Sequence, residues 1–251
     1  FYDLLDHSGK IQLLINSGEI DELYLKLFEN FDIGDIIAVN GEIIKTKKGE
    51  LSIKVNETTI LSKSLRTLPE KWHGLKDKET RFRQRYLDLI VNPESKKILQ
   101  TRSNVVRLLR EYLHTNEFIE VETPILQSKA GGAIAKPFLT HHNALNLDMY
   151  LRIAPELYLK RLVIGGFEKV FEIGKIFRNE GIDQTHQPEF TMLESYQAYA
   201  DMNIVMDMVE DMCEYVFDNL EINKEIEFNG EQASFSSCLL YTSDAADDLG
   251  R

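Results

Sequence analysis

Side chains that can hold a charged substrate are concentrated in one stretch of the chain, residues 168–199. The side chains concerned are Arg178, Glu172, Glu194, Tyr196 and the ring of Phe190. An arginine fork binds a carboxylate or a phosphate at two points, and carboxylates bind an ammonium group. An aromatic ring can stack on a purine or on a guanidinium. This set of residues can therefore bind a zwitterion with an additional positive charge, together with a nucleotide phosphate.

Two strands are needed to bring these side chains together. Alternating residue types predict strands over 170–178 and 189–197, joined by a polar loop over 179–188. Every second side chain of a strand faces the same way. If the two strands pair antiparallel, the side chains that face one cavity are Arg178, Glu194 and Tyr196, with Glu156 and Glu172 as possible neighbours. A purely structural cluster of ion pairs on the sheet is the alternative.

Three amphipathic helices are expected around this sheet. The first covers 93–115, because a capping asparagine, a proline and an acidic residue open it and an apolar stripe follows. The second begins at Pro155 and ends at Gly165. The third begins after Asp201, which is a capping residue.

The first 62 residues have a different pattern. Apolar and β-branched runs over 35–44 and 51–55 flank a predicted hairpin turn at 46–50, and the apolar residues of 21–30 have helical spacing. Short strands with one inserted helix predict a small β-barrel of the oligonucleotide-binding (OB) type that lacks its first strand. The predicted fold class is therefore α+β: an OB-type barrel followed by a partial domain on an antiparallel sheet.

Composition indicates a globular protein whose charge is unevenly distributed. The 251 residues include 29 Lys and Arg, 41 Asp and Glu and two cysteines, with a net charge of -12. Two cysteines make neither a disulfide framework nor a four-ligand zinc site, and no apolar run approaches the about 18 residues that span a bilayer. We therefore expect a cytoplasmic protein with no membrane partner.

Residues 63–110 hold thirteen Lys and Arg against five Asp and Glu, a local charge of +8. Residues 201–251 hold two Lys and Arg against thirteen Asp and Glu, a local charge of -11. A polyanion can meet the basic segment while the remainder repels it. The alternative is that the basic residues only form a solvated face; those in question are Lys71, Lys76, Lys78, Arg81, Arg83 and Arg85.

Several blocks of this sequence occur in the order of a known family. Residues 177–181 (FRNEG) and 188–194 (PEFTMLE) resemble motif 2 of the class II aminoacyl-tRNA synthetases, and residues 116–126 resemble motif 1. Within the class, the resemblance is strongest to the lysine-specific enzymes of subclass IIb; the supporting blocks are 83–89, 131–138 and 150–158. The resemblance covers about residues 1–235. It departs from the family at Glu117, where glycine is more usual, and at Gln187, where asparagine is usual.

The resemblance implies a lysine–tRNA ligase that forms lysyl-adenylate from lysine and ATP and transfers the lysyl group to tRNA(Lys). It implies that Arg178 bridges the lysine carboxylate and the α-phosphate. The implied ATP-binding residues are Arg178, Asn179, Glu180, His186, Gln187 and Phe190. The implied lysine-binding residues are Gly132, Glu156, Arg178, Glu194 and Tyr196. The implied anticodon-binding residues are Phe1, Gln12 and Glu50. Without the resemblance, we would interpret Phe1 as a core aromatic, Gln12 as an exposed strand residue and Glu50 as a hairpin residue.

The resemblance also implies a domain division: an anticodon-binding domain over 1–62, a linker over 63–76 and a catalytic domain over 77–235. A homodimer is expected through the motif 1 region, 93–125. The family continues past Glu231 with motif 3 and the Mg²⁺ ligands, so no metal ligand is assigned to the present residues. We expect residues 236–251 to be a non-native, poorly packed tail, and the 251 residues alone not to form lysyl-adenylate.

Three other hypotheses stay open. An aspartate or asparagine enzyme of the same subclass shares the motifs, although Glu194 and Tyr196 suit an ammonium tip better than a carboxylate or amide. A lysyl transferase that modifies a protein lacks the barrel, so residues 1–62 count against it. A binding module, with the barrel fused to an inactive synthetase body, is the third.

Overall fold

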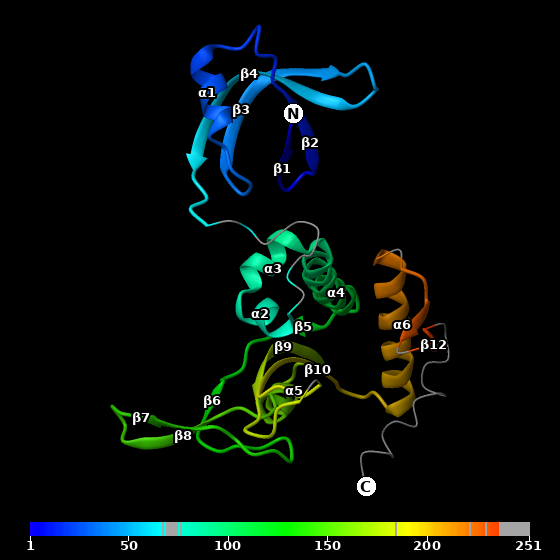
Figure 1. Ribbon diagram of the computed structural model, residues 1–251. Helices are drawn as coiled ribbons and strands as arrows, with labels where there is room; N and C mark the ends of the chain where they lie inside the picture. The colour runs from blue at the N-terminus through cyan, green and yellow to red at the C-terminus, as the bar shows by residue number, and fades with distance from the viewer. Residues whose placement is uncertain are drawn as a thin grey trace. The chain divides into compact units, whose positions relative to one another are not determined.

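The computed structural model describes residues 1–66, 68, 75, 77–183, 185–220, 222–228 and 230–235. The chain forms two compact units, Phe1–Ile98 and Leu99–Arg251 (Figure 1). The predicted tail, 236–251, and most of the predicted linker, 63–76, lie outside the described residues. In the described part of the chain, no helix is long and apolar enough to cross a membrane.

The first unit contains a four-stranded sheet and a short helix. The strands are β1 (Tyr2–Leu5), β2 (Lys10–Leu14), β3 (Ile36–Lys45) and β4 (Leu51–Ser62), in the order β1-β2-β4-β3. Strand β2 runs parallel to β4, and the other pairs are antiparallel. Helix α1 (Glu22–Glu29) begins at the N-cap Asp21, whose carboxylate accepts from the backbone N–H of Leu23. The predicted strands, hairpin and inserted helix are confirmed, but β1 and β3 remain the edges of the described sheet, so no barrel closes.

Small helices follow the sheet in the first unit: α2 (Lys78–Arg83) and α3 (Arg85–Val91). They are held by Asp88, whose buried carboxylate accepts from Arg81 Nε at 2.6 Å, Arg85 Nη1 at 2.7 Å and Asn92 Nδ2 at 2.6 Å. These hydrogen bonds, that of Asn92 first, lower the pKa of Asp88. Arg81 and Arg85, which are 36% and 43% exposed, therefore neutralise a buried acid while part of each side chain faces solvent.

The second unit is built from helices and short sheets. Its helices are α4 (Pro93–Thr115), which begins in the first unit and continues into the second from Leu99, α5 (Glu156–Ile164) and α6 (Met202–Leu220). Its strands are β5 (Ile119–Glu120), β6 (Leu126–Gln127), β7 (Leu139–His142), β8 (Leu147–Leu151), β9 (Lys169–Phe177), β10 (Glu189–Gln197), β11 (Glu225–Phe228) and β12 (Glu231–Ser234). The sheets have the orders β10-β9-β5, β6-β8-β7 and β11-β12. The three predicted helices are confirmed, and Asp201 accepts from the N–H of Ile204 at 3.0 Å at the start of α6.

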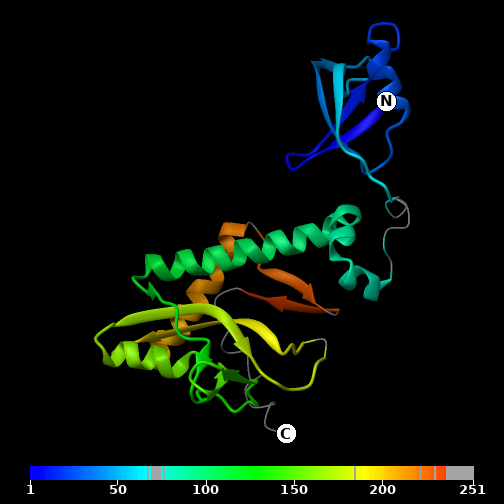
Figure 2. The same ribbon diagram turned by 90° about the vertical axis from the view of Figure 1, so that its left-hand side faces the viewer.

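One face of the β9–β10 pair is buried in the core of this unit. Phe171 of β9 packs with Leu113 of α4 and with Phe118, and residues of α6 such as Met208 and Met212 pack against the same cluster. Helix α5 contacts β9 and β10 as well, and Figure 2 shows α4 and α5 on opposite sides of the two strands. Because Phe171 faces this core, the alternate side chains of β9 and β10 face the α5 side.

Candidate active site

The pairing of β9 with β10 brings the predicted site residues to one face of the sheet. The strands are antiparallel, and in their register Glu172 lies opposite Glu194, Val170 opposite Tyr196 and Ile176 opposite Phe190. Opposite residues of a pair share a face. The predicted pairing is therefore confirmed, and the acids at 172 and 194 lie on the side away from Phe171 and the core.

Glu194 is surrounded by the charged groups that the sequence predicted. Burial raises the pKa of Glu194, and the negative charges of Glu156 and Glu172 raise it further. The hydroxyl of Tyr196 donates to Glu194 Oε2 at 3.1 Å, which lowers the pKa, as does the nearby charge of Arg178. Glu194 is half-buried, and the negative charges of two other acids act on it, so a cation bound beside it would be favoured.

Tyr196 is fixed as a hydrogen-bond donor. Burial raises the pKa of its hydroxyl, and the charge of Glu194 and the hydrogen bond to it act in the same direction. The phenol therefore stays protonated at neutral pH and donates to the acid beside it.

Arg178 carries a donor without a partner. Its Nε is buried and has no hydrogen-bond acceptor among the described residues. Its guanidinium carbon lies 5.3 Å from the centre of the Phe190 ring, and its backbone N–H donates to Pro188 O at 2.9 Å. Buried donors are almost always satisfied, so this arginine is ready to receive an anionic oxygen. It lies on the same face as Glu194, as predicted.

Gly132 and Glu156 meet at the start of α5. Gly132 has a φ of +89°, and a Cβ added to it would lie 3.0 Å from the Cβ of Glu156 and 3.5 Å from its Oε2. The other oxygen of Glu156, Oε1, accepts from Lys160 Nζ at 2.5 Å. Only glycine therefore allows the loop at 132 to approach Glu156 this closely in this backbone conformation.

The loop after β9 divides into an inner and an outer part. The N–H of Asn179 donates to Lys136 O at 2.8 Å, and Glu180 Oε1 accepts from the N–H of Lys136 at 3.3 Å. Further along, exposed His186 is bound to Asp183, with 2.8 Å between its Nδ1 and Asp183 Oδ2. Hydrogen bonds from the backbone of Thr185 and from His186 lower the pKa of Asp183.

Gln187 donates to the carbonyl oxygen of Asp183 at 3.2 Å. The structure thus places His186 and Gln187 together on a surface loop organised by Asp183. Sequence reasoning did not identify Asp183, although an aspartate three residues before a histidine is typical of such a turn.

A buried arginine, Arg152, is a further residue that sequence reasoning did not assign to the site. It is 2% exposed and forms an ion pair with Glu172, which is 3% exposed. Thr123 donates its hydroxyl to Glu172 Oε2 at 2.6 Å. Glu172 was expected as a possible neighbour of the cavity; its charge acts on Glu194, but both oxygens of its carboxylate already have partners. The apolar residues around position 152 were the only sequence signal that this arginine is buried.

Known families match both parts of the chain. Residues 77–245 match the tRNA synthetases class II (D, K and N), and residues 1–61 match the OB-fold nucleic acid binding domain. The chain belongs to the class II tRNA synthetases. The OB match confirms the type of fold predicted for the first residues of this synthetase chain, and the exact boundaries 1–62, 63–76 and 77–235 stay predictions.

Curated relatives are named lysine–tRNA ligase. That of Clostridium botulinum (strain Hall, type A) is 53% identical over 236 residues, which are 94% of this chain and 47% of the relative. That of Moorella thermoacetica is 56% identical over 216 residues, 86% of this chain and 44% of the relative. That of Syntrophomonas wolfei is 53% identical over 236 residues, which are 94% of this chain and 48% of the relative. The synthetase chain thus spans about half the length of the curated relatives it matches.

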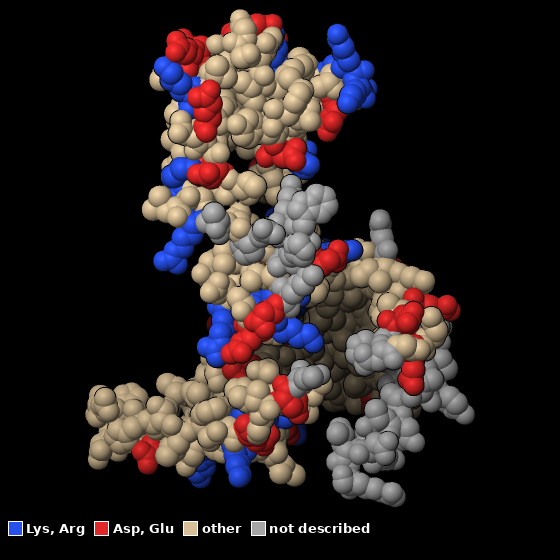
Figure 3. Space-filling model, in the orientation of Figure 1, with Lys and Arg blue, Asp and Glu red and all other residues tan. Residues whose placement is uncertain are grey.

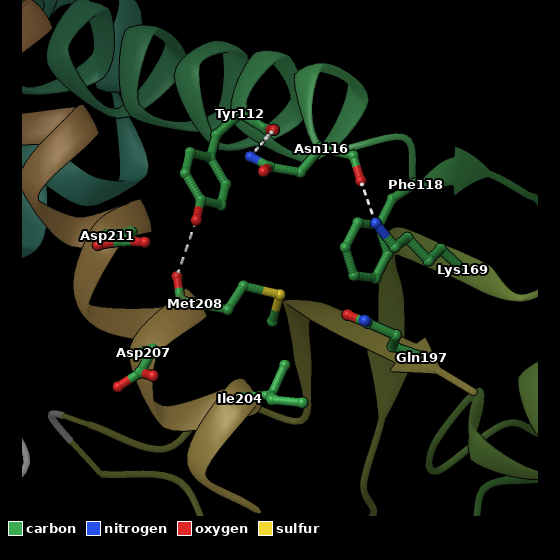
Figure 4. A pocket seen from close by; sticks show the side chains of 9 residues that line it. All are labelled: Tyr112, Asn116, Phe118, Lys169, Gln197, Ile204, Asp207, Met208 and Asp211. Carbon is green, nitrogen blue, oxygen red and sulfur yellow. Dashed lines mark hydrogen bonds between the residues drawn. The ribbon is translucent and has the colours of Figure 1, made fainter. Parts of the chain in front are cut away.

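The second unit also contains a cavity away from these residues. It has a volume of about 230 Å³ and is lined by Tyr112, Asn116, Phe118, Lys169, Gln197, Ile204, Asp207, Met208 and Asp211 (Figure 4). Phe118 and Met208 belong to the core cluster on the α4 side of the sheet. This cavity therefore lies on the opposite face from Arg178 and Glu194 and is not the predicted site.

The three residues expected to read an anticodon lie in the OB-type unit. Phe1 is 76% exposed, so the interpretation of Phe1 as a core aromatic is wrong. Gln12 is half-buried, and its Oε1 accepts from Ser52 Oγ at 3.0 Å. Glu50 is exposed at the end of the β3–β4 hairpin, where its N–H donates to Thr46 Oγ1 at 3.1 Å.

Proposed function

We propose that this synthetase is a lysine–tRNA ligase, which activates lysine with ATP and transfers the lysyl group to tRNA(Lys). The observation that carries the proposal is the unpartnered, buried Nε of Arg178 on the same sheet face as the acidic cluster around Glu194. An anionic oxygen and an ammonium group of one molecule satisfy both features. The names of the relatives support lysine as that molecule.

The α-amino group and the side chain of lysine are bound by different acids in this proposal. Glu156, with the close backbone of Gly132, holds the α-ammonium, and Glu194 with Tyr196 contacts the side-chain end. A site made of an acid and a hydroxyl rejects a substrate whose side chain ends in a neutral or an anionic group. A neutral group would leave the carboxylate of the site without a counter-charge, and an anionic group would be repelled by it. This distinguishes lysine from aspartate and asparagine.

Activation is then a matter of position and charge. One carboxylate oxygen of lysine attacks the α-phosphorus of ATP, the new O–P bond forms, and the bond to pyrophosphate breaks with its electrons on the leaving oxygen. Arg178 bridges the lysine carboxylate and the α-phosphate and neutralises the charge that would keep them apart. Phe190 stacks on the adenine, Asn179 and Glu180 contact its edge, and His186 with Gln187 reaches the outer phosphates.

Mg²⁺ would supply further neutralisation of the phosphates. The described residues contain no group of three or more His, Cys, Asp or Glu side chains placed to hold a metal ion. No step of this mechanism is therefore assigned to a metal-binding residue of the present chain.

The other partners follow from the same proposal. The OB-type unit binds the anticodon of tRNA(Lys) through Phe1, Gln12 and Glu50. Two copies of the chain associate through the motif 1 region, 93–125, and the enzyme works in the cytoplasm.

Amino-acid-dependent exchange of pyrophosphate into ATP tests the proposal. The protein is assayed at its full natural length against a panel that contains lysine, arginine, ornithine, aspartate and asparagine. We expect exchange with lysine at a rate at least about 100-fold above that with aspartate or asparagine. Exchange with aspartate or asparagine would favour the other enzymes of the subclass, and tRNA binding without exchange would favour a binding module.

A further inference from the structure

Behind the proposed lysine pocket lies a buried charged cluster with no assigned role. Arg152 and Glu172 are almost fully buried and pair with each other. Glu172 lies directly opposite Glu194 in the β9–β10 register, and the charge of Glu172 acts on Glu194. The cluster is therefore in direct electrostatic contact with the pocket, although it is closed to solvent.

Nearly every polar atom of this cluster is engaged. Arg152 donates from Nε to Lys175 O at 2.8 Å and from Nη1 to Thr123 O at 3.2 Å and Thr123 Oγ1 at 3.1 Å. The second carboxylate oxygen of Glu172 accepts from the hydroxyl of Thr123 at 2.6 Å and from its N–H at 3.3 Å. Thr123 thus contacts both charged groups and fixes their orientation.

The sheet also leaves space for this cluster. A Cβ added to Gly174 would lie 2.2 Å from Nη2 of Arg152 and 3.1 Å from Oε1 of Glu172. Glycine weakens the interior of a strand, and a buried ion pair contributes little net stability compared with apolar residues of the same size. Stability alone is therefore a weak reason for this arrangement.

We propose that Thr123 and Arg152 are positioning residues: they hold the carboxylate of Glu172 away from Glu194, so that Glu194 is free to bind the ammonium group of lysine. This inference rests on the function proposed above. Two carboxylates that face each other on paired strands compete for one proton or one cation. Arg152 and Thr123 occupy both oxygens of Glu172, which leaves Glu194 as the open acid of the pair.

The groups that act on Glu194 come from each element around it. They are Glu156 of α5, Glu172 of β9, Arg178 at the end of β9 and Tyr196 of β10. Replacing Thr123 by valine changes none of these directly; it removes the hydroxyl that donates to Glu172 and accepts from Arg152. Glu172 then turns toward Glu194, the pKa of Glu194 rises, and lysine has to displace a proton at low pH.

The experiment is lysine titration calorimetry at pH 6 and pH 8 on the protein at its full natural length, with Thr123→Val as the test variant. We expect binding to weaken more at pH 6 than at pH 8, by at most about tenfold for each unit by which the pKa of Glu194 rises. Thr123→Ser keeps the hydroxyl and should restore the original pH profile. Thr140→Val, an exposed threonine of β7, is the matched control and should have no effect.

Glu172→Gln provides an independent readout of opposite sign. It removes the negative charge opposite Glu194, so lysine binding should persist to lower pH than in the unmodified protein. If Thr123→Val lowers only the thermal midpoint and leaves the pH profile unchanged, or if both variants shift the profile in the same direction, the positioning role is refuted. Failure of the unmodified protein to bind lysine would instead refute the proposed function.

Discussion

At the scale of single residues, the site is defined by charges that lack partners. Arg178 has a buried donor without an acceptor among the described residues, and Glu194 is a half-buried acid on which the charges of Glu156 and Glu172 also act. Each deficit is costly in the free protein, because buried polar and charged groups need compensation. A ligand that carries a carboxylate and an ammonium group supplies an acceptor for Arg178 and a positive charge for Glu194. Both unfavourable features are therefore compensated when the ligand binds.

The raised pKa of Glu194 predicts the pH dependence of lysine binding. Only the ionised carboxylate binds an ammonium, and this form is lost when the pH falls through a pKa that lies above the usual range for glutamate. Affinity for lysine should therefore decrease with falling pH, by about tenfold per unit once the pH is below that pKa. Calorimetry between pH 5 and pH 8 measures this, and a flat profile would contradict it.

Glu194→Gln should separate stability from binding. Because the folded state raises the pKa of Glu194, ionisation of this residue destabilises the folded protein as the pH rises above the unfolded value. The amide removes that cost, so the thermal midpoint at pH 8 should stay equal or rise while lysine affinity is lost. A lower midpoint with unchanged lysine affinity would show that the acid is structural.

Replacement of Arg178 by lysine should affect catalysis much more than stability. Lysine keeps the charge but not the planar fork, so it cannot bridge two anions in the same way. We expect lysine-dependent pyrophosphate exchange to fall at least about 100-fold, as for removal of a donor to a transition-state oxygen. Arg83→Lys, in an exposed surface pair with Glu79, is the control and should leave exchange unchanged.

At the scale of elements, strand alternation predicted most of the site, because period-two patterns fix which side chains share a face. The strands β9 and β10 and the helices α4, α5 and α6 are where the sequence placed them. The cluster around Arg152 was not predicted, because its members come from segments that are distant in sequence and no local pattern marks a buried ion pair. The burial of Asp88 was not predicted for a different reason: its partners lie close in sequence, but they are charged and polar residues of a type usually found at the surface.

Helix α4 offers a test of its own buried stripe. Leu113 is fully buried in the core cluster, whereas Ile98 near the start of the helix is 65% exposed. Leu113→Ala should lower the free energy of unfolding by about 2–5 kcal/mol, the usual cost of a cavity in a core. Ile98→Ala should change it by less than about 0.5 kcal/mol. Urea unfolding followed by circular dichroism measures both, and equal effects would contradict the packing described for α4.

At the scale of the whole molecule, the distribution of charge is more local than the sequence indicated. The basic segment 63–110 is partly neutralised by nearby acids, as in the pairs Arg107–Glu111 and Arg110–Glu120. Figure 3 shows acidic side chains gathered over α6 and basic ones at the tip of the β3–β4 hairpin. Sums of charge along the sequence could not predict this, because they do not record which acids lie beside which bases.

The hairpin tip is therefore where we expect the OB-type unit to meet an RNA backbone. Lys47 and Lys48 lie in the turn between β3 and β4, next to the exposed Glu50. Each lysine that neutralises a phosphate adds roughly 0.7–0.9 to the slope of log affinity against log salt concentration. Replacing both by glutamate should weaken binding of tRNA(Lys) at least about tenfold and reduce that slope by roughly one to two.

Lys26→Glu on α1 is the matched control for this pair of lysines. Lys26 is exposed and pairs with Glu22, so its replacement changes the net charge of the unit in the same direction without changing the hairpin. If binding depended only on the net charge of the chain, Lys26→Glu would weaken it about as much per charge as the hairpin variant, and the salt slope would fall equally. A loss confined to the hairpin variant would instead locate the phosphate contacts at this turn, since a net charge of -12 opposes RNA binding everywhere that basic side chains are not gathered.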